Sequence, residues 1–320
     1  MSTLGARILQ DLTLPEGAHY CDTLSEDQIA QAATQVRALW GAEHSPASYL
    51  GHVHEQIHRS EGALHYAGVI DECGALIASH KRYQVDLASP AGDVSAMGIG
   101  AVFTPETHRG HGLAPSMLAE AMRRAKTRDV KLAILFSEID ARFYERLGFR
   151  VLPAHTFHAS VADLPEDPDL ELTPCDDFSL MLKLYDASFP DGSWYRKRTA
   201  GSFRYWAWRH GARARFLMAH RGEVVGYLSV ALRAHALWVE DAVRVNTSRA
   251  VLWAALAQLA RKAERAQVAG WLRPDDAGDP FVEQDRSLCV PMARGLGAAD
   301  ENLVHSLVES GVYFSALDSF

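Results

Sequence analysis

A glycine-containing segment at positions 109–114, RGHGLA, carries the clearest chemical signal in the sequence. It follows an apolar run that ends at Phe103 and precedes a stretch with helical spacing of Leu113, Met117 and Met122. Small residues allow backbone N–H groups to point into such a turn, and a helix N-terminus adds partial positive charge. We expect this loop to bind an anion, for which a pyrophosphate is well suited. It is not a P-loop, because no GKS or GKT follows, and it does not match GxGxxG.

A second segment, FYERLGF at positions 143–149, stands some thirty residues further on. It follows the run LAILF at positions 132–136, which is apolar without alternation. Such a run is typical of a central strand buried on both faces. The two segments are therefore separated by one predicted helix and one predicted strand.

In this order and at this separation, the two segments resemble the GNAT superfamily of N-acetyltransferases. The superfamily motif is Arg or Gln, two residues, Gly, one residue, then Gly or Ala, which Arg109, Gly112 and Ala114 match. The later helix of the family commonly ends in FY-x-x-x-GF, which positions 143–149 match. The resemblance covers about residues 20–160 and implies an α/β fold. In this fold the central strands of a twisted mixed sheet part to admit the pantetheine arm of acetyl-CoA.

The resemblance also implies which residues contact acetyl-CoA. Backbone groups of Val102, Phe103 and Thr104 would pair with pantetheine as if with another strand. The glycine-containing loop would hold the pyrophosphate, and Ser137 and Glu138 would flank the coenzyme. The whole implied set is Val102, Phe103, Thr104, Arg109, Gly110, His111, Gly112, Leu113, Ala114, Ser137 and Glu138.

Acetyl transfer to an amine requires two proton transfers. The amine must lose a proton before it attacks the thioester, and the departing thiolate must be protonated or stabilised. In the family a tyrosine in the FY position is the acid, which implies this role for Tyr144. The base is left open among Glu106, His108 and Glu138.

The order of predicted elements indicates two domains. Two helices are expected at positions 26–60, the first with Ser25 as N-cap, and strands at 63–71, 74–87 and 95–103. An acidic segment with three prolines at 162–177 is expected to link a catalytic GNAT domain at 1–162 to a second domain at 168–320. There the element order partly repeats, but the turn VRVNTSRAVL has no glycine. We expect tandem GNAT domains, each a mixed twisted sheet flanked by helices, with a degenerate second copy.

Tandem proteins of this kind are similar to the enhanced-intracellular-survival type of acetyltransferases. Those proteins carry a third, sterol-carrier-like domain, for which 320 residues leave no room. In them a C-terminal phenylalanine carboxylate is the base, which implies that role for Phe320. The tail GVYFSALDSF alternates at Val312, Phe314 and Ala316, which suggests a strand. The other interpretation is that Phe314 and Phe320 cap the core of the second domain.

Two further patterns suggest other chemistry. HEQIH at positions 54–58 is an HExxH motif, in which His54 and His58 could hold zinc with Glu55 as base. The histidine that follows, His65, lies one residue too far for the longer metzincin pattern, so we expect no metal. The aromatic run FRYWAWR at 203–209 could stack on bases. Without a basic field around it, core or interdomain packing is expected.

Composition limits the partners and the compartment. The formal net charge is -8, and no block of Lys and Arg provides the surface that a nucleic acid requires. No segment is long and apolar enough to span a membrane, and no signal peptide is recognisable. Four cysteines stand far apart without a CxxC pair, which favours a reducing cytoplasm. A homo-oligomer remains open.

We therefore expect an N-acetyltransferase that moves the acetyl group of acetyl-CoA to a primary amine by direct attack in a ternary complex. The acceptor is left open among free lysine, a protein lysine and another primary amine. A non-catalytic acyl-CoA-binding sensor is the alternative, and an HExxH metalloprotease is a remote one.

Overall fold

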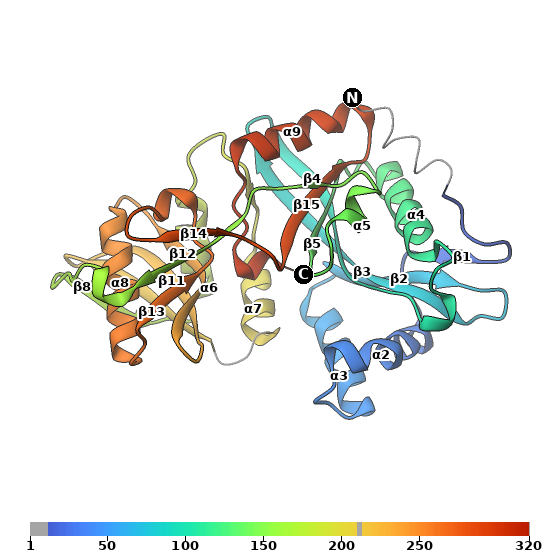
Figure 1. Cartoon of the computed structure of the whole chain (residues 1–320), viewed down its shortest axis with the longest axis horizontal. Coiled ribbons are helices and arrows are strands. Elements are labelled where there is room, and N and C mark those ends of the chain that lie inside the picture. Colours follow the sequence, from blue (N-terminus) through green and yellow to red (C-terminus); the bar gives the residue numbers. More distant parts are fainter. Residues whose placement is uncertain (1–11, 210–212, 320) are drawn as a thin grey trace.

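The strands of the chain gather into two mixed sheets flanked by helices, as Figure 1 shows. The computed structural model describes residues 12–209 and 213–319. The first sheet has the order β1-β2-β3-β4-β5-β15-β6, with β9 paired to β3. The second has the order β14-β7-β13-β12-β11-β10-β8. The α/β architecture with two mixed sheets flanked by helices, predicted from the sequence, is thus confirmed. No described helix is long and apolar enough to cross a membrane.

The elements have the following bounds. The first sheet contains β1 (His19–Cys21), β2 (Leu64–Ile70), β3 (Leu76–Ser89), β4 (Gly92–Phe103), β5 (Leu132–Ser137), β6 (Arg150–Val151), β9 (Tyr195–Arg196) and β15 (Val290–Gly295). The second contains β7 (His155–Ser160), β8 (Leu170–Pro174), β10 (Ala214–His220), β11 (Glu223–Leu232), β12 (Ala236–Arg244), β13 (Gln267–Gly270) and β14 (Val282–Asp285). The α-helices are α2 (Glu26–Trp40), α3 (Pro46–Arg59), α4 (Leu113–Thr127), α5 (Arg142–Glu145), α6 (Phe178–Ala187), α7 (Ala200–Arg209), α8 (Arg249–Lys262) and α9 (Glu301–Ser310).

Local sequence accounts for the helices that surround the first sheet. Ser25 caps α2, and its hydroxyl and the side chain of Gln28 form a reciprocal capping box, as the predicted N-cap requires. Ser45 caps α3, which has Pro46 in its first turn. Helix α4 buries one face, which includes Met117 and Met122, against the sheet, and Arg124 and Lys126 lie in its last turn.

The central strands β4 and β5 are parallel and part along their length. Their pairing runs from Ala96 with Leu132 to Ile99 with Leu135 and then ends, although both strands continue. On its other edge β4 has a bulge against β3: Lys81 pairs with Gly100 and Ser79 with Phe103. Ala101, within the bulge, has a φ of 48°. A bulge bends its strand and increases the local twist, so it turns the end of β4 away from β5.

The second sheet repeats this arrangement. Strands β12 and β13 are parallel, joined through α8, and their pairing ends at Val239 with Gly270. Next to this point, the pairing of β12 with β11 has a register shift in which Glu240 is the extra residue. Beyond it, Arg244 of β12 forms an ion pair with the buried Asp276, whose backbone carbonyl accepts a bond of 2.8 Å from the Trp253 indole of α8. Protein side chains therefore bridge the second gap, where the first has a glycine-containing loop.

The two halves exchange strands: β7 of the first half joins the second sheet, and β9 and β15 of the second half join the first. Strand β7 lies before the acidic segment but pairs with β13 and β14 of the second sheet. Strand β15 lies near the end of the chain but pairs with β5 and β6 of the first (Figure 1). Strand pairing therefore crosses residues 162–168 in both directions, and the division of the chain into domains at these residues stays a prediction. Strand β15 pairs with the open edge of β5, and this long-range pairing sets the strand order of the first sheet. The composition of a linker carries no information about such pairing.

The last described residues are held by a buried ion cluster. The guanidinium of Arg198 donates to Asp241 at 2.6 Å and to Asp318 at 2.8 Å, and none of these side chains is exposed. Ser315 caps the short turn that contains Asp318. The predicted strand over 312–316 is wrong, because only Tyr313 forms an isolated bridge and the capped turn follows it at once. Phe314 packs in a core cluster of the first sheet.

The strand exchange predicts that a fault in β15 destabilises the first half. Ala293 has no exposed surface and packs beside β5, so Ala293→Asp buries a charge without a partner. We expect the free energy of unfolding to fall by about 3 kcal/mol, measured by denaturant titration with circular dichroism. Val282→Asp, at an exposed position in β14, is the control. Equal stability of the two variants would contradict the described pairing.

Candidate functional site

The parted edge of β4 exposes backbone groups toward a gap. Val102 and Phe103 lie beyond the last pair with β5, and Thr104 follows them. The hydroxyl of Thr104 is buried and has no hydrogen-bond partner among the described residues. An unpaired strand edge can pair with an extended ligand, as in β-strand addition. The three residues that the sequence analysis singled out here thus lie together at the end of the parted strand.

The glycine-containing loop lies between this edge and α4. Gly110 and Gly112 have φ values of 81° and 72°, and Gly112 is the N-cap of the fifteen-residue helix. A Cβ added at either glycine would meet no atom within 4 Å, so the space in front of the loop is open. Arg109 donates through Nε to the Thr104 carbonyl at 3.0 Å. Backbone conformation, open space and a helix N-terminus meet here, as an anion site requires.

The other side of the gap is the end of β5. Ser137 is buried, and its hydroxyl donates to the Ile139 carbonyl at 2.8 Å, which fixes the turn after the strand. Glu138 is exposed, and its carboxylate accepts from the Cys289 thiol at 3.7 Å. Burial, followed by the charge of Glu138, raises the pKa of Cys289 to about 11. Cys289 comes from the loop before the exchanged strand, so no local motif could reveal it.

Tyr144 lies in α5, directly after this turn. Its side chain is 8% exposed and packs edge-on against Phe143 and Phe149, with ring centroids 4.9 Å and 6.0 Å away. Burial, and after it the charge of Glu138, raises the pKa of Tyr144 to about 12. The phenol therefore keeps its proton through the neutral range and can donate it.

The three candidate bases do not lie together. Glu106 and His108 form a short turn between β4 and the loop, where Glu106 accepts from Arg109 at 3.4 Å. Glu138 alone lies at the end of β5 and acts electrostatically on Tyr144. The geometry brings Glu138 to the tyrosine and leaves the other two beside the anion loop.

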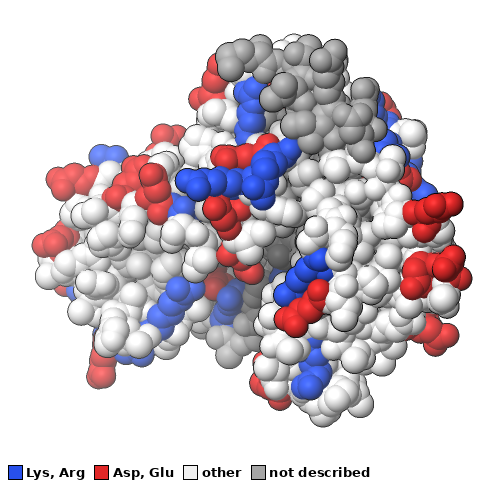
Figure 2. Space-filling model, turned by 45° about the vertical axis from the view of Figure 1, so that its right-hand side comes forward, with Lys and Arg blue, Asp and Glu red and all other residues white. Residues whose placement is uncertain are grey.

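A cavity of about 300 Å³ lies between β3 and α7 and involves both halves of the chain. Its lining includes Tyr83 of β3 and Tyr205 and Arg209 of α7, with Glu61, Asp86 and Ser319. Figure 2 shows the molecular face hollowed between the two halves, with acidic and basic side chains both present around the hollow. No sequence motif marks this cavity, because its residues are far apart in the chain.

The aromatic run packs as expected. Phe203, Tyr205 and Trp206 belong to a buried cluster of the second half, and Trp208 stacks on His52 of α3 at 5.0 Å. The stretch therefore serves core and interdomain contacts. Phe320 lies outside the described residues. Ser319, before it, accepts a bond of 3.3 Å from Arg209.

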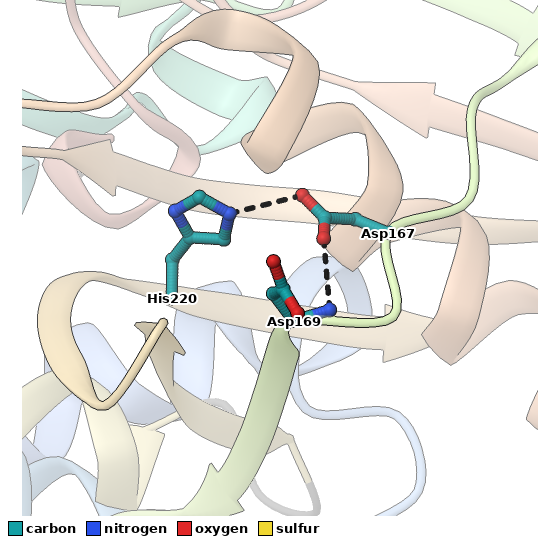
Figure 3. Close-up of side chains that lie close together, drawn as sticks. All are labelled: Asp167, Asp169 and His220. Carbon is teal, nitrogen blue, oxygen red and sulfur yellow. Dashed lines mark hydrogen bonds and ion pairs between the residues drawn. The ribbon is translucent and has the colours of Figure 1, made fainter.

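The HEQIH segment lies in α3, where His54 and His58 are exposed and Glu55 is paired with Arg59 at 2.5 Å. Within residues 12–209 and 213–319, one group of three side chains has metal-ligating spacing, and it does not include these histidines. It consists of Asp167, Asp169 and His220 in the second half (Figure 3). His220 and Asp167 are 3.2 Å apart, and Asp169 pairs with Arg221, so their own hydrogen bonds account for the arrangement.

Part of the chain matches a known protein family. The family described as "Acetyltransferase (GNAT) domain" matches residues 21–152. No curated protein sequence matches the chain. Among solved structures, the chain is similar to a GCN5-related N-acetyltransferase from Kribbella flavida, with 18% identity, a TM-score of 0.66 and coverage of 88% of this chain and 72% of that one.

Two other solved structures are similar to the chain. A probable N-acyltransferase from Enterococcus faecalis has 13% identity and a TM-score of 0.73, with 87% of this chain and 73% of that one covered. Eis1 from Mycobacterium abscessus has 18% identity and a TM-score of 0.63, with 87% and 74% covered. At these identities the likeness shows a shared fold across both halves.

The anion loop can be tested with a matched pair of glycine variants. Gly112→Glu places a bulky negative charge where we expect a pyrophosphate, so the affinity for acetyl-CoA should fall by about tenfold or more. Gly74→Glu is the control, because Gly74 has a φ of 83° and the same open surroundings but lies in the turn between β2 and β3. Calorimetry should show weak binding only in the first variant. Equal affinities would refute the assignment of this loop.

Proposed function

We propose that this chain, whose residues 21–152 form a GNAT acetyltransferase domain, moves the acetyl group of acetyl-CoA to a primary amine. The observation that carries the proposal is the parting of β4 and β5 beside the glycine-containing loop. The same gap has Tyr144 and Glu138 on its β5 side. The gap thus offers a strand edge for an extended arm of the ligand, a loop for its anionic group, and a proton donor for the leaving group.

Two local features of the gap fit acetyl-CoA. The buried hydroxyl of Thr104 lacks a partner in the described part of the chain, and the space in front of Gly110 and Gly112 is open. In the proposal, Val102, Phe103 and Thr104 bind the pantetheine arm through the backbone, and Arg109–Ala114 bind the pyrophosphate. Acetyl-CoA supplies an activated thioester carbonyl.

The reaction proceeds by direct attack. The ammonium group of the acceptor first gives one proton to a base, and its nitrogen then forms a bond to the thioester carbon. The carbon–sulfur bond breaks, and the thiolate sulfur takes a proton from the Tyr144 hydroxyl. The nitrogen loses its second proton as the amide forms; one of the two protons lost by the nitrogen returns Tyr144 to the phenol and the other passes to solvent. Net, one proton is released for each amide and thiol produced.

Two features support particular roles in the proton transfers. The raised pKa of Tyr144 keeps its hydroxyl protonated, which suits a donor to the leaving sulfur. Glu138 is the candidate base nearest the tyrosine, while Glu106 and His108 stay open. The carboxylate of Phe320 stays a prediction as well.

A non-catalytic acyl-CoA sensor is the competing function. It would use the same gap and loop, but it would release no free thiol when any amine is added. The second half, whose gap is bridged by Arg244 and Asp276, fits a structural role beside the first. The HExxH metalloprotease has no comparable support, because Glu55 is paired with Arg59.

The Tyr144→Phe variant tests whether Tyr144 acts as an acid or only packs in the core. The variant keeps the ring and its contacts with Phe143 and Phe149 but removes the hydroxyl. We expect kcat to fall by roughly 10²- to 10⁴-fold, with little change in the affinity for acetyl-CoA. Thiol release and calorimetry on the same samples measure both quantities. Tyr195→Phe, in β9, is the control for a lost phenol elsewhere, and a wild-type kcat in Tyr144→Phe would make Tyr144 purely structural.

A further inference from the structure

Two cations lie on the face of the first sheet opposite α4 without an acidic partner. Lys81 of β3 and Arg209 of α7 form no ion pair with an Asp or Glu among the described residues. Lys81 donates to the amide oxygen of Gln56 at 2.7 Å, and Arg209 donates to the Ser319 carbonyl at 3.3 Å. Cations removed from bulk water normally have an anionic partner.

Tyrosine hydroxyls and an amide lie near the two cations, and the charge of Glu138 also acts on Arg209. The Lys81 ammonium lies 5.3 Å from the centre of the Tyr66 ring. Burial, with a smaller effect from the charge of Arg209, lowers the pKa of Lys81 to about 7. The charge of Arg209 also acts on the hydroxyls of Tyr66, Tyr83 and Tyr205. The described residues therefore place no carboxylate within ion-pair distance of either cation, and Glu138 acts on Arg209 from further away.

One hydroxyl in this group lacks a partner. Tyr66 is 4% exposed, and its hydroxyl oxygen has no hydrogen-bond partner in the described part of the chain. A buried hydroxyl without a partner costs free energy, which a bound acceptor atom would recover. Tyr66, Lys81 and Arg209 come from β2, β3 and α7, so three elements of the fold provide donors to one region.

This region adjoins the reaction site and the cavity. Arg209 lines the cavity of about 300 Å³, together with Tyr83 and Tyr205. Its charge also acts on Cys289, which contacts Glu138 at the end of β5. Lys81 pairs through its backbone with Gly100, two residues before Val102. Glu61 and Asp86 also line the cavity, whereas Lys81 and Tyr66 are not among its lining residues. A small molecule in the cavity would thus meet Arg209, whose charge also acts on Lys81.

We propose that the acceptor amine carries a carboxylate, as a small amino acid does, and that Arg209, Lys81 and the Tyr66 hydroxyl bind this carboxylate. This inference rests on the proposed acetyl transfer and names its substrate class. Arg209 offers a planar pair of donors that suits a carboxylate, and Lys81 adds a point charge. A volume of about 300 Å³ is at the small end of ligand sites, which favours a compact acceptor.

The test compares acceptors that differ only at the carboxylate. Alanine, alaninamide and ethylamine form one set, and 5-aminopentanoate, its amide and pentylamine form another. We expect kcat/KM, followed by thiol release, to be about tenfold or more higher for the carboxylate member of at least one set than for its amide. Equal values for carboxylate and amide in both sets would overturn the proposal.

Variants of Arg209 and Lys81 show whether these side chains distinguish a carboxylate from its amide. Arg209→Gln and Lys81→Met should each reduce the ratio of carboxylate to amide kcat/KM toward one, and Arg209→Lys should restore part of it. Arg221→Gln and Lys262→Met, at exposed positions of the second half, are the matched controls. Because the readout is a ratio within one variant, a general loss of folded protein does not mimic it. A ratio that stays at the wild-type value in both variants would refute the assignment.

A binding measurement separates this inference from the proposed function. Calorimetry with CoA-saturated protein compares the same carboxylates and amides without any turnover. If no amine yields thiol but a carboxylate still binds more tightly than its amide, and Arg209→Gln removes the difference, the acetyl transfer fails and the carboxylate site stands. If amines are acetylated but neither binding nor kcat/KM distinguishes the carboxylate, the transfer stands and the carboxylate site is refuted.

Discussion

The parting of β4 from β5 is the constraint on which the rest of the site depends. Pairing ends at Ile99 and Leu135, and the bulge around Ala101 turns β4 away while its other edge stays paired with β3. Two central strands can separate only if each is held on its outer side. Strand β3 holds β4, and the exchanged strand β15 holds β5. The gap is thus a product of the whole sheet, although only a few of its residues would touch a ligand.

The exchange of β7 and β15 makes the two halves one structural unit. The first sheet needs β15 from the end of the chain, and the loop before β15 delivers Cys289 to Glu138. Helix α7 of the second half contributes Arg209 to the cavity beside β3, and the charge of Arg209 acts on Cys289. The buried cluster around Arg198 fixes the turn that leads to Ser319. A second half with a bridged gap can therefore still shape the site of the first.

The sequence predicts the features that neighbouring residues determine. It does not predict the features that depend on pairing between distant segments. The loop at 109–114 and the tyrosine after LAILF were found because backbone conformation and helix position are written in neighbouring residues. Strand β15, with the sequence VPMARG, contains a proline and no alternation, and its pairing with β5 depends on an edge formed 150 residues earlier. The sequence does not predict the association of Lys81 with Arg209 for the same reason, because the two cations belong to β3 and α7, which are far apart in the chain.

We infer that acetyl-CoA lies in the gap between β4 and β5 of the first half. A crystal structure of the protein with CoA tests it most directly. We expect an extended pantetheine arm beside the backbone of Val102–Thr104, a pyrophosphate at the amides of 110–114, and the sulfur facing Tyr144. A coenzyme bound instead between β12 and β13, or outside both gaps, would contradict the account.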